Sequence, residues 1–154
     1  NEFDQRVNIL FNLMKNGGND GFKIIFDDEK NKENIKFILQ NSIKMNHDIA
    51  YFILDKINSD DVIIDKNQID FNFLLLAIQY YNENIIIKLI IILKDLFNES
   101  ENISKFIDHL LNYTSPKMIK SLFIRLSSLL QKDFIIQIKN YLIEGGFIVI
   151  ANLI

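Results

Sequence analysis

Cysteine is missing from this chain of 154 residues, which also has only one proline and two histidines. Without a thiol the chain can form no disulfide, no thiolate metal site and no cysteine nucleophile, and its composition fits a reducing compartment. Two histidines leave little material for proton-transfer chemistry. We therefore expect no enzymatic centre, no metal site and no bound cofactor.

An excess of positive charge is missing as well. Lys and Arg together number 17 against 20 Asp and Glu, which gives a net charge of −3 at pH 7. Phosphate backbones and anionic lipids are bound by concentrations of basic side chains. We therefore expect a partner that is neither a nucleic acid nor a membrane.

Long apolar segments are also absent. The longest apolar run, residues 85–93, is interrupted by Lys88 and falls short of the roughly 20 residues that cross a bilayer. The first residues, Asn-Glu-Phe-Asp-Gln-Arg, are polar and do not resemble a signal peptide. These features predict a cytoplasmic protein.

The periodicity of the apolar residues predicts the fold class. A chain of about 150 residues buries roughly 68–70% of its unfolded surface and can fold as one domain. Isoleucine is abundant and would favour strands by propensity alone, but apolar residues recur at steps of three and four, which indicates helices. The fold is therefore predicted to be all-α. The helical stripes cover residues 3–14, 35–43, 49–57, 71–78, 86–97, 103–111, 119–130 and 133–144.

Local signals predict where several helices begin and end. Ser115 can cap a helix that has Pro116 at its first position. The pair Gly145-Gly146 stands where a left-handed helix end belongs. A tight turn is expected at 45–47 and a longer loop at 58–70, so the helices pair as antiparallel neighbours.

The helix pairs recur along the sequence. Leu74 and Leu89 fall on Ile107 and Leu122 with an offset of 33 residues, while the earlier pair needs 36 residues for its first helix and 37 for its second. A fixed period with two helices per unit is typical of stacked repeats. We predict one domain over residues 1–154, a helical-repeat solenoid of stacked antiparallel helix pairs that forms a segment of a longer chain. The predicted units are about 3–30, 31–69, 70–99, 100–131 and 132–154.

Several segments resemble the ankyrin repeat. Residues 54–57, 61–67, 73–78 and 86–90 resemble that family's order of helix end, aspartate–valine loop, leucine–alanine helix and isoleucine–lysine–leucine helix. The family's threonine–proline–leucine–histidine start is absent, and the long late helices make armadillo-like or HEAT-like repeats a close competitor. Either resemblance implies a binding scaffold and not a catalyst.

Two histidines are the candidates for catalysis. His47 precedes Asp48, and such a pair can hold a divalent ion, but the upstream histidine that completes a phosphohydrolase site is absent. His109 lies alone in a helical stripe of leucines. A surface turn and a helix-surface histidine are the favoured interpretations, and an α-helical enzyme domain is the less favoured alternative.

Aromatic and acidic side chains mark the expected partner surface. Tyr80 and Tyr113 recur at the repeat offset, and Tyr81 is adjacent to the first. Tyrosines are favoured in contact sites, although each could instead seal the end of its own helix pair. Asp60 and Asp61 in the long loop are the second candidates. We predict a non-catalytic scaffold that binds another protein; a structural helical segment of a larger multidomain regulatory protein is the alternative.

Overall fold

The structure is a computed structural model that describes residues 29–58 and 69–154, together with the single positions 5, 9, 12 and 16. The elements in this part of the chain are all helical, which confirms the predicted all-α class. They are α3 (Glu29–Met45), α4 (His47–Asn58), α5 (Phe71–Gln79), α6 (Glu83–Leu93), the 3-10 helix η2 (Lys94–Asn98), α7 (Ser100–Tyr113), α8 (Pro116–Leu129), α9 (Lys132–Glu144) and α10 (Ile148–Ala151). The helix expected at 3–14 and most of the loop expected at 58–70 lie outside the described residues.

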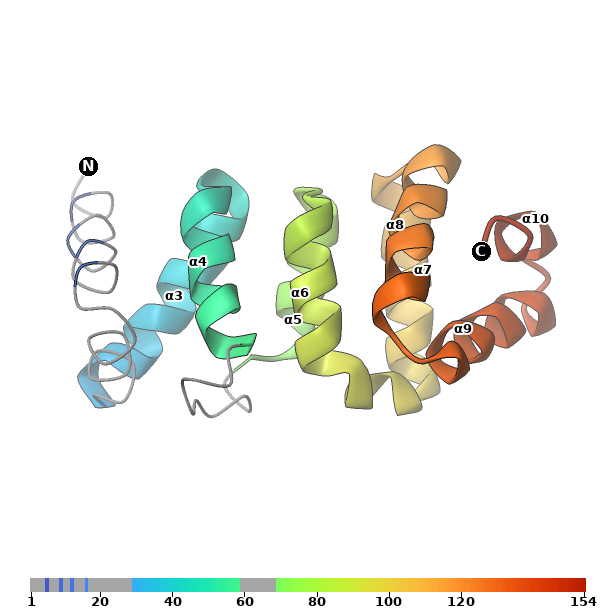
Figure 1. Cartoon of the computed structure of the whole chain (residues 1–154), viewed down its shortest axis with the longest axis horizontal. Helices are drawn as coiled ribbons and strands as arrows, with labels where there is room; N and C mark the ends of the chain where they lie inside the picture. The colour runs from blue at the N-terminus through green and yellow to red at the C-terminus, as the bar shows by residue number, and fades with distance from the viewer. Residues whose placement is uncertain (1–4, 6–8, 10–11, 13–15, 17–28, 59–68) are drawn as a thin grey trace.

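The helices follow one another along the long axis of the molecule in chain order (Figure 1). Helix α3 contacts α5, and α5 contacts α7; in the same way α4 contacts α6, and α6 contacts α8. Helices α3 and α4 also contact each other, as do α5 and α6. Helices α3, α5 and α7 therefore contact one another in turn, and so do α4, α6 and α8, whereas α9 contacts α8 and α10. Among the described helices none is long and apolar enough to cross a membrane.

One capping contact recurs at the start of the second helix in each of three pairs. The Oδ1 atom of Asn46 accepts a hydrogen bond from the backbone N–H of Ile49 at 3.3 Å. Asn82 Oδ1 accepts from Ile85 N–H at 3.2 Å, and Ser115 Oγ accepts from Met118 N–H at 3.3 Å. Each side chain satisfies a backbone donor that a helix start would otherwise leave unpaired.

The positions of the caps give a second measure of the predicted spacing between helix pairs. Asn46 and Asn82 are 36 residues apart, and Asn82 and Ser115 are 33 residues apart. Aligned by their caps, Ile49 corresponds to Ile85, an offset of 36 residues, whereas the apolar pattern aligned Ile49 with Ile86. The apolar pattern alone does not decide between these offsets because Ile85 and Ile86 are both buried.

The buried apolar side chains form one continuous cluster through the described pairs. Leu74 and Ile107, which the repeat predicts to be equivalent, are 0% and 2% exposed, and Leu89 and Leu122 are both 0% exposed. Phe97 of η2 lies inside this cluster, with its ring centroid 5.3 Å from Phe71, 5.2 Å from Phe106 and 5.0 Å from Phe134. A short 3-10 segment thus joins three helices through edge-to-face ring contacts.

The end of α9 shows the predicted glycine motif. Gly146 has φ of 85°, a conformation that glycine adopts without steric strain. The N–H of Phe147 donates to the carbonyl of Leu142 at 2.8 Å, and the N–H of Gly146 donates to Ile143 at 3.1 Å. This is the hydrogen-bond pattern of a Schellman helix end. It turns the chain so that α10 packs against α9, with Ala151 fully buried.

Candidate functional site

Tyr80 and Tyr113 are the predicted site residues that the structure leaves open to solvent. Tyr80 is the C-cap residue that directly follows α5, and Tyr113 is the last residue of α7. Their side chains are 40% and 47% exposed, respectively. The ring of Tyr113 lies beside the ring of His109 one turn earlier, with centroids 5.6 Å apart. Both tyrosines therefore offer a ring and a hydroxyl at corresponding ends of α5 and α7.

Tyr81 has a different environment from its neighbour. It is partly buried, and its hydroxyl lies 3.3 Å from the carbonyl oxygen of Met118 and 3.4 Å from Oε2 of Glu83. Burial, together with the negative charge and hydrogen bond of Glu83, raises the pKa of Tyr81 to about 12, although the nearby Arg125 opposes this shift. The hydroxyl is therefore occupied within the protein, where it connects the α5–α6 turn to α8.

Glu83 extends this contact into a polar cluster. Its Oε1 atom pairs with the guanidinium of Arg125 at 3.0 Å, and its Oε2 atom accepts from Ser121 Oγ at 3.0 Å. Glu83 lies in the first turn of α6, where a carboxylate is favoured by the helix dipole. Tyr81, Glu83, Ser121 and Arg125 thus connect one helix pair to the next.

His47 at the start of α4 makes a similar contact between pairs, because it bonds to Asn82, the cap of α6. Because Asn82 Oδ1 accepts from a backbone N–H, its Nδ2 group is the atom that donates to Nδ1 of His47, at 3.2 Å. The other ring nitrogen, Nε2, lies 3.0 Å from the carbonyl oxygen of Ile43. These partners assign His47 the tautomer that carries its proton on Nε2. Both nitrogens are therefore engaged: Nδ1 connects α4 to Asn82 of the next pair, and Nε2 bonds to α3 within the same pair.

The second histidine lies elsewhere in the fold. Nδ1 of His109 is 3.1 Å from the carbonyl oxygen of Lys105, within α7. In the part of the chain that the structure describes, no three His, Asp or Glu side chains are grouped as metal ligands would be. The structure does not bring the two histidines to one site.

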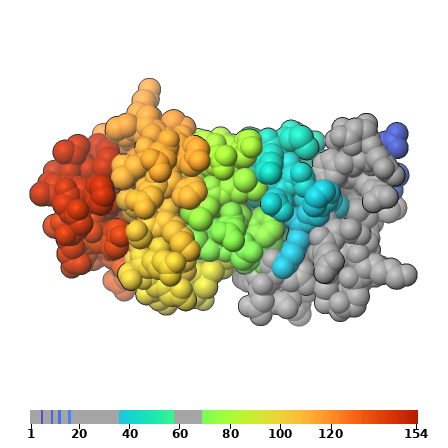
Figure 2. Space-filling view, turned by 180° about the vertical axis from the view of Figure 1, so that it is seen from behind, coloured from blue at the N-terminus to red at the C-terminus, as the bar shows by residue number. Residues whose placement is uncertain are grey.

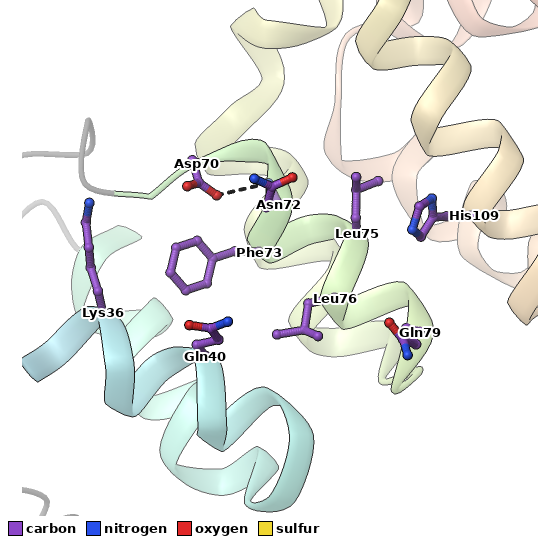
Figure 3. A pocket seen from close by; sticks show the side chains of 9 residues that line it. All are labelled: Lys36, Gln40, Asp70, Asn72, Phe73, Leu75, Leu76, Gln79 and His109. Atoms are coloured by element: carbon purple, nitrogen blue, oxygen red, sulfur yellow. Dashed lines mark hydrogen bonds between the residues drawn. The ribbon is translucent and has the colours of Figure 1, made fainter. Parts of the chain in front are cut away.

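A groove of about 470 Å³ lies on the side of the molecule formed by α3, α5 and α7. Helix α6 lies in front of α5 in Figure 1, so the reverse view in Figure 2 presents the α5 side. Three helices contribute the lining residues, which are Lys36, Gln40, Asp70, Asn72, Phe73, Leu75, Leu76, Gln79 and His109 (Figure 3).

The groove has an apolar middle and polar margins. Phe73 is largely buried, while Leu75 and Leu76 are partly exposed. Gln40 and Gln79 are exposed, and their amides have no hydrogen-bond partner among the described residues. Asp70 caps α5 by accepting from the N–H of Asn72 at 3.0 Å. The surface therefore combines apolar contact area with amides that are free to bind a ligand.

Sequence reasoning missed this groove, although a signal for it exists. Gln40, Leu76 and His109 are separated by the same 36 and 33 residues as the three caps. They belong to α3, α5 and α7, and all three line the groove. A search for repeated surface positions, in addition to repeated apolar ones, would have indicated this face.

The predicted residues Asp60 and Asp61 lie outside the described residues, so the acidic part of the expected surface stays a prediction. The described chain resumes at Ile69, which is 5% exposed, next to the cap Asp70. Of the five predicted partner residues, the structure thus describes three tyrosines and shows two of them open to solvent.

Comparisons of the chain with known proteins give no relative from which a family could be assigned. The resemblance to ankyrin repeats, and the competing resemblance to armadillo-like and HEAT-like repeats, stay predictions that rest on the residues alone. No family model, no curated protein and no solved structure matches this chain significantly.

Proposed function

We propose that this chain is a non-catalytic scaffold that binds another protein, built as a helical-repeat solenoid of stacked antiparallel pairs. The observation that carries the proposal is the equivalence of α3, α5 and α7. Their following helices begin with the same cap, they contact one another in chain order, and equivalent residues line one groove. Stacked units of this kind generate continuous binding surfaces.

The packing supports a rigid surface. The continuous apolar core and the polar contacts between pairs hold neighbouring helices in fixed positions before a partner arrives. A preorganised surface loses little conformational entropy on binding. Tyr80 and Tyr113 suit such a surface because tyrosine offers a large contact area with few rotatable bonds. The absence of cysteine suits a reducing compartment, and we place this interaction in the cytoplasm.

The environments of the histidines also favour binding over catalysis. A general base needs a nitrogen that can reach a substrate proton. Both nitrogens of His47 bond to protein groups, and His109 lies on a different helix with one nitrogen directed to its own backbone. We assign His47 to the contact between pairs and His109 to the binding face.

Affinity capture followed by reconstitution with the purified partner tests the proposal. Replacing Tyr80 and Tyr113 together by alanine should weaken binding at least tenfold, because aromatic anchors dominate such interfaces. Charge reversal of Asp60 and Asp61 tests the predicted loop in the same assay. Tyr51→Ala is the matched control, since Tyr51 is 43% exposed but lies on α4 and not on α3, α5 or α7. Unchanged affinity in all the tyrosine and aspartate variants would reject this surface.

A structural role inside a larger protein is the second candidate. Ile148 and Val149 of α10 are 57% and 77% exposed, and Ile143 of α9 is 48% exposed. Strongly exposed large apolar side chains suit a surface that another protein segment covers. If this is their role, replacing Ile148 and Val149 by lysine should leave the Tyr80 and Tyr113 interaction intact while abolishing any self-association seen by light scattering.

A further inference from the structure

The groove on the side of α3, α5 and α7 has the features of a peptide-binding site. We infer that it binds an extended, net-neutral peptide segment of the partner, which crosses α5 and places aliphatic side chains on either side of it. This inference rests on the proposed scaffold function and names the chemistry that the scaffold recognises.

The placement of two consecutive leucines indicates that the ligand crosses α5. Leu76 points toward Gln40 of α3, whereas Leu75 lies on the other side of α5 near His109 of α7 (Figure 3). The lining therefore includes both valleys that border α5, that is, the surface depression between α3 and α5 and the one between α5 and α7. A helix lying along one valley would contact only half of this lining, whereas a chain running across the helices contacts all of it.

The dimensions fit an extended chain. Packed helices lie about 8–10 Å apart, and an extended chain advances about 3.3 Å per residue. About three residues therefore separate the two valleys, and roughly six residues span the distance from α3 to α7. Because side chains of an extended chain alternate between two faces, the chain is predicted to place one aliphatic residue over Leu76 and a second, two or four positions away, over Leu75.

The polar groups fit a peptide backbone. A primary amide carries both a donor and an acceptor, and so does each peptide unit. Gln40 and Gln79 come from different helices, are exposed, and have amides without partners in the described part of the chain. Each can therefore bind one peptide unit of a crossing chain without breaking a bond inside the protein.

The charges of the lining favour a neutral segment. Among the residues that the structure describes, Lys36 and Asp70 are the charged ones that line the groove, and their charges are opposite. A ligand without net charge therefore matches it. Its affinity should change little with salt, whereas the affinity of a nucleic acid falls steeply as salt is added.

A display library of random twelve-residue peptides, selected on the intact chain, provides the probe. The inference predicts enriched sequences with two aliphatic residues two or four positions apart and no net charge. A synthetic peptide of the enriched sequence is then measured by fluorescence polarisation. Replacing Gln40 and Gln79 together by alanine should weaken its binding at least tenfold.

The controls separate the groove from the rest of the molecule. Gln131→Ala should leave peptide affinity unchanged, because Gln131 is exposed at the start of α9 and does not line the groove. Circular dichroism of each variant checks the fold; if the double variant unfolds, Gln79→Glu, which keeps the size of the side chain, takes its place. Affinity that falls steeply with salt, peptides that bind the groove variants equally well, or no enrichment overturns the inference.

The two proposals fail in different ways. If the purified protein partner binds and this binding depends on Tyr80 and Tyr113 but not on Gln40 and Gln79, the peptide groove is rejected and the scaffold stands. If no protein partner and no peptide bind, both proposals are rejected.

Discussion

The hydroxyl of Ser42 is an unusual feature of the core at the scale of single residues. Ser42 is 3% exposed, and its Oγ atom has no hydrogen-bond partner among the residues that the structure describes. The predicted offset of 36 residues aligns Ser42 with Ile78, which is fully buried. Position 42 is therefore an apolar position occupied by a polar side chain.

Replacing Ser42 by alanine should stabilise the protein. Removing a buried hydroxyl without a partner relieves a desolvation penalty of about 1–3 kcal/mol. The packing energy of the contacts that the oxygen makes is lost and offsets part of this gain. We expect a net gain of about 1 kcal/mol, measured as a higher urea midpoint with an unchanged slope. Ser104→Ala is the control, because Ser104 lies in the middle of α7 but is partly exposed. A lower midpoint for Ser42→Ala would contradict the assignment.

Tyr81 should make the stability of the protein depend on alkaline pH. Its pKa in the folded protein is about 12, against an ordinary value of 10.0. The unfolded chain therefore releases this proton first, so the contribution of Tyr81 is full below pH 10 and is lost as the pH rises toward 12. Tyr81→Phe should lower the free energy of unfolding by about 1 kcal/mol at neutral pH. The difference in unfolding free energy between this variant and the natural chain should become smaller as the pH rises from 10 to 12. Urea unfolding at several pH values measures this gap, and parallel pH profiles would contradict the prediction.

At the scale of helices, the caps explain why the pairs share one geometry. Asn46, Asn82 and Ser115 each satisfy the N–H three residues ahead. Asn82 does more than the other two, because its amide also donates to His47. A single side chain thus starts α6 and ties it to the beginning of α4.

Exchanging cap residues tests this equivalence. Ser115→Ala should destabilise the protein by about 1 kcal/mol, since it removes the side-chain acceptor. Ser115→Asn should stay within about 0.5 kcal/mol of the natural chain, because asparagine performs the same role at the two equivalent positions and is an equally good cap. Chemical denaturation of both variants provides the measurement. Equal losses for alanine and asparagine would show that position 115 differs from 46 and 82.

At the scale of the whole molecule, Phe97 connects more of the fold than its position in a short 3-10 helix indicates. Its ring contacts the rings of Phe71, Phe106 and Phe134, from α5, α7 and α9. Its carbonyl oxygen also accepts from Nε2 of Gln137 at 2.9 Å. Three consecutive pairs thus share one aromatic centre.

Phe97→Ala should therefore lower the stability of α5, α7 and α9 at the same time. Truncating a buried phenylalanine costs about 3–5 kcal/mol, and we expect faster hydrogen exchange in α5, α7 and α9 alike. Ile124→Ala is the control; Ile124 is 61% exposed, and exposed substitutions usually stay within about 0.5 kcal/mol. If Phe97→Ala prevents folding, Phe97→Leu gives the same comparison. Faster exchange confined to η2 would contradict a shared centre.

The sequence determined the local structure of this protein. Apolar steps of three and four predicted the helices, Ser115 and Pro116 predicted the start of α8, and Gly145-Gly146 predicted the end of α9. These features depend on residues within a few positions of one another, where backbone geometry and hydrogen bonding follow directly from the side chains. The exposed tyrosines at the ends of α5 and α7 were accessible to the same reasoning.

Only the tertiary structure decided which surface positions come together. The groove needs α3, α5 and α7 in contact, and the assignment of Tyr81 to an internal contact needs α8 beside the α5–α6 turn. The caps align the second helix of the first pair at 36 residues, the offset that the apolar pattern gave only for the first helix, because apolar patterns shifted by one residue overlap in a helix rich in isoleucine. Long-range distances depend on how side chains from separate helices fill space together, and that information is not present in any single segment of the chain.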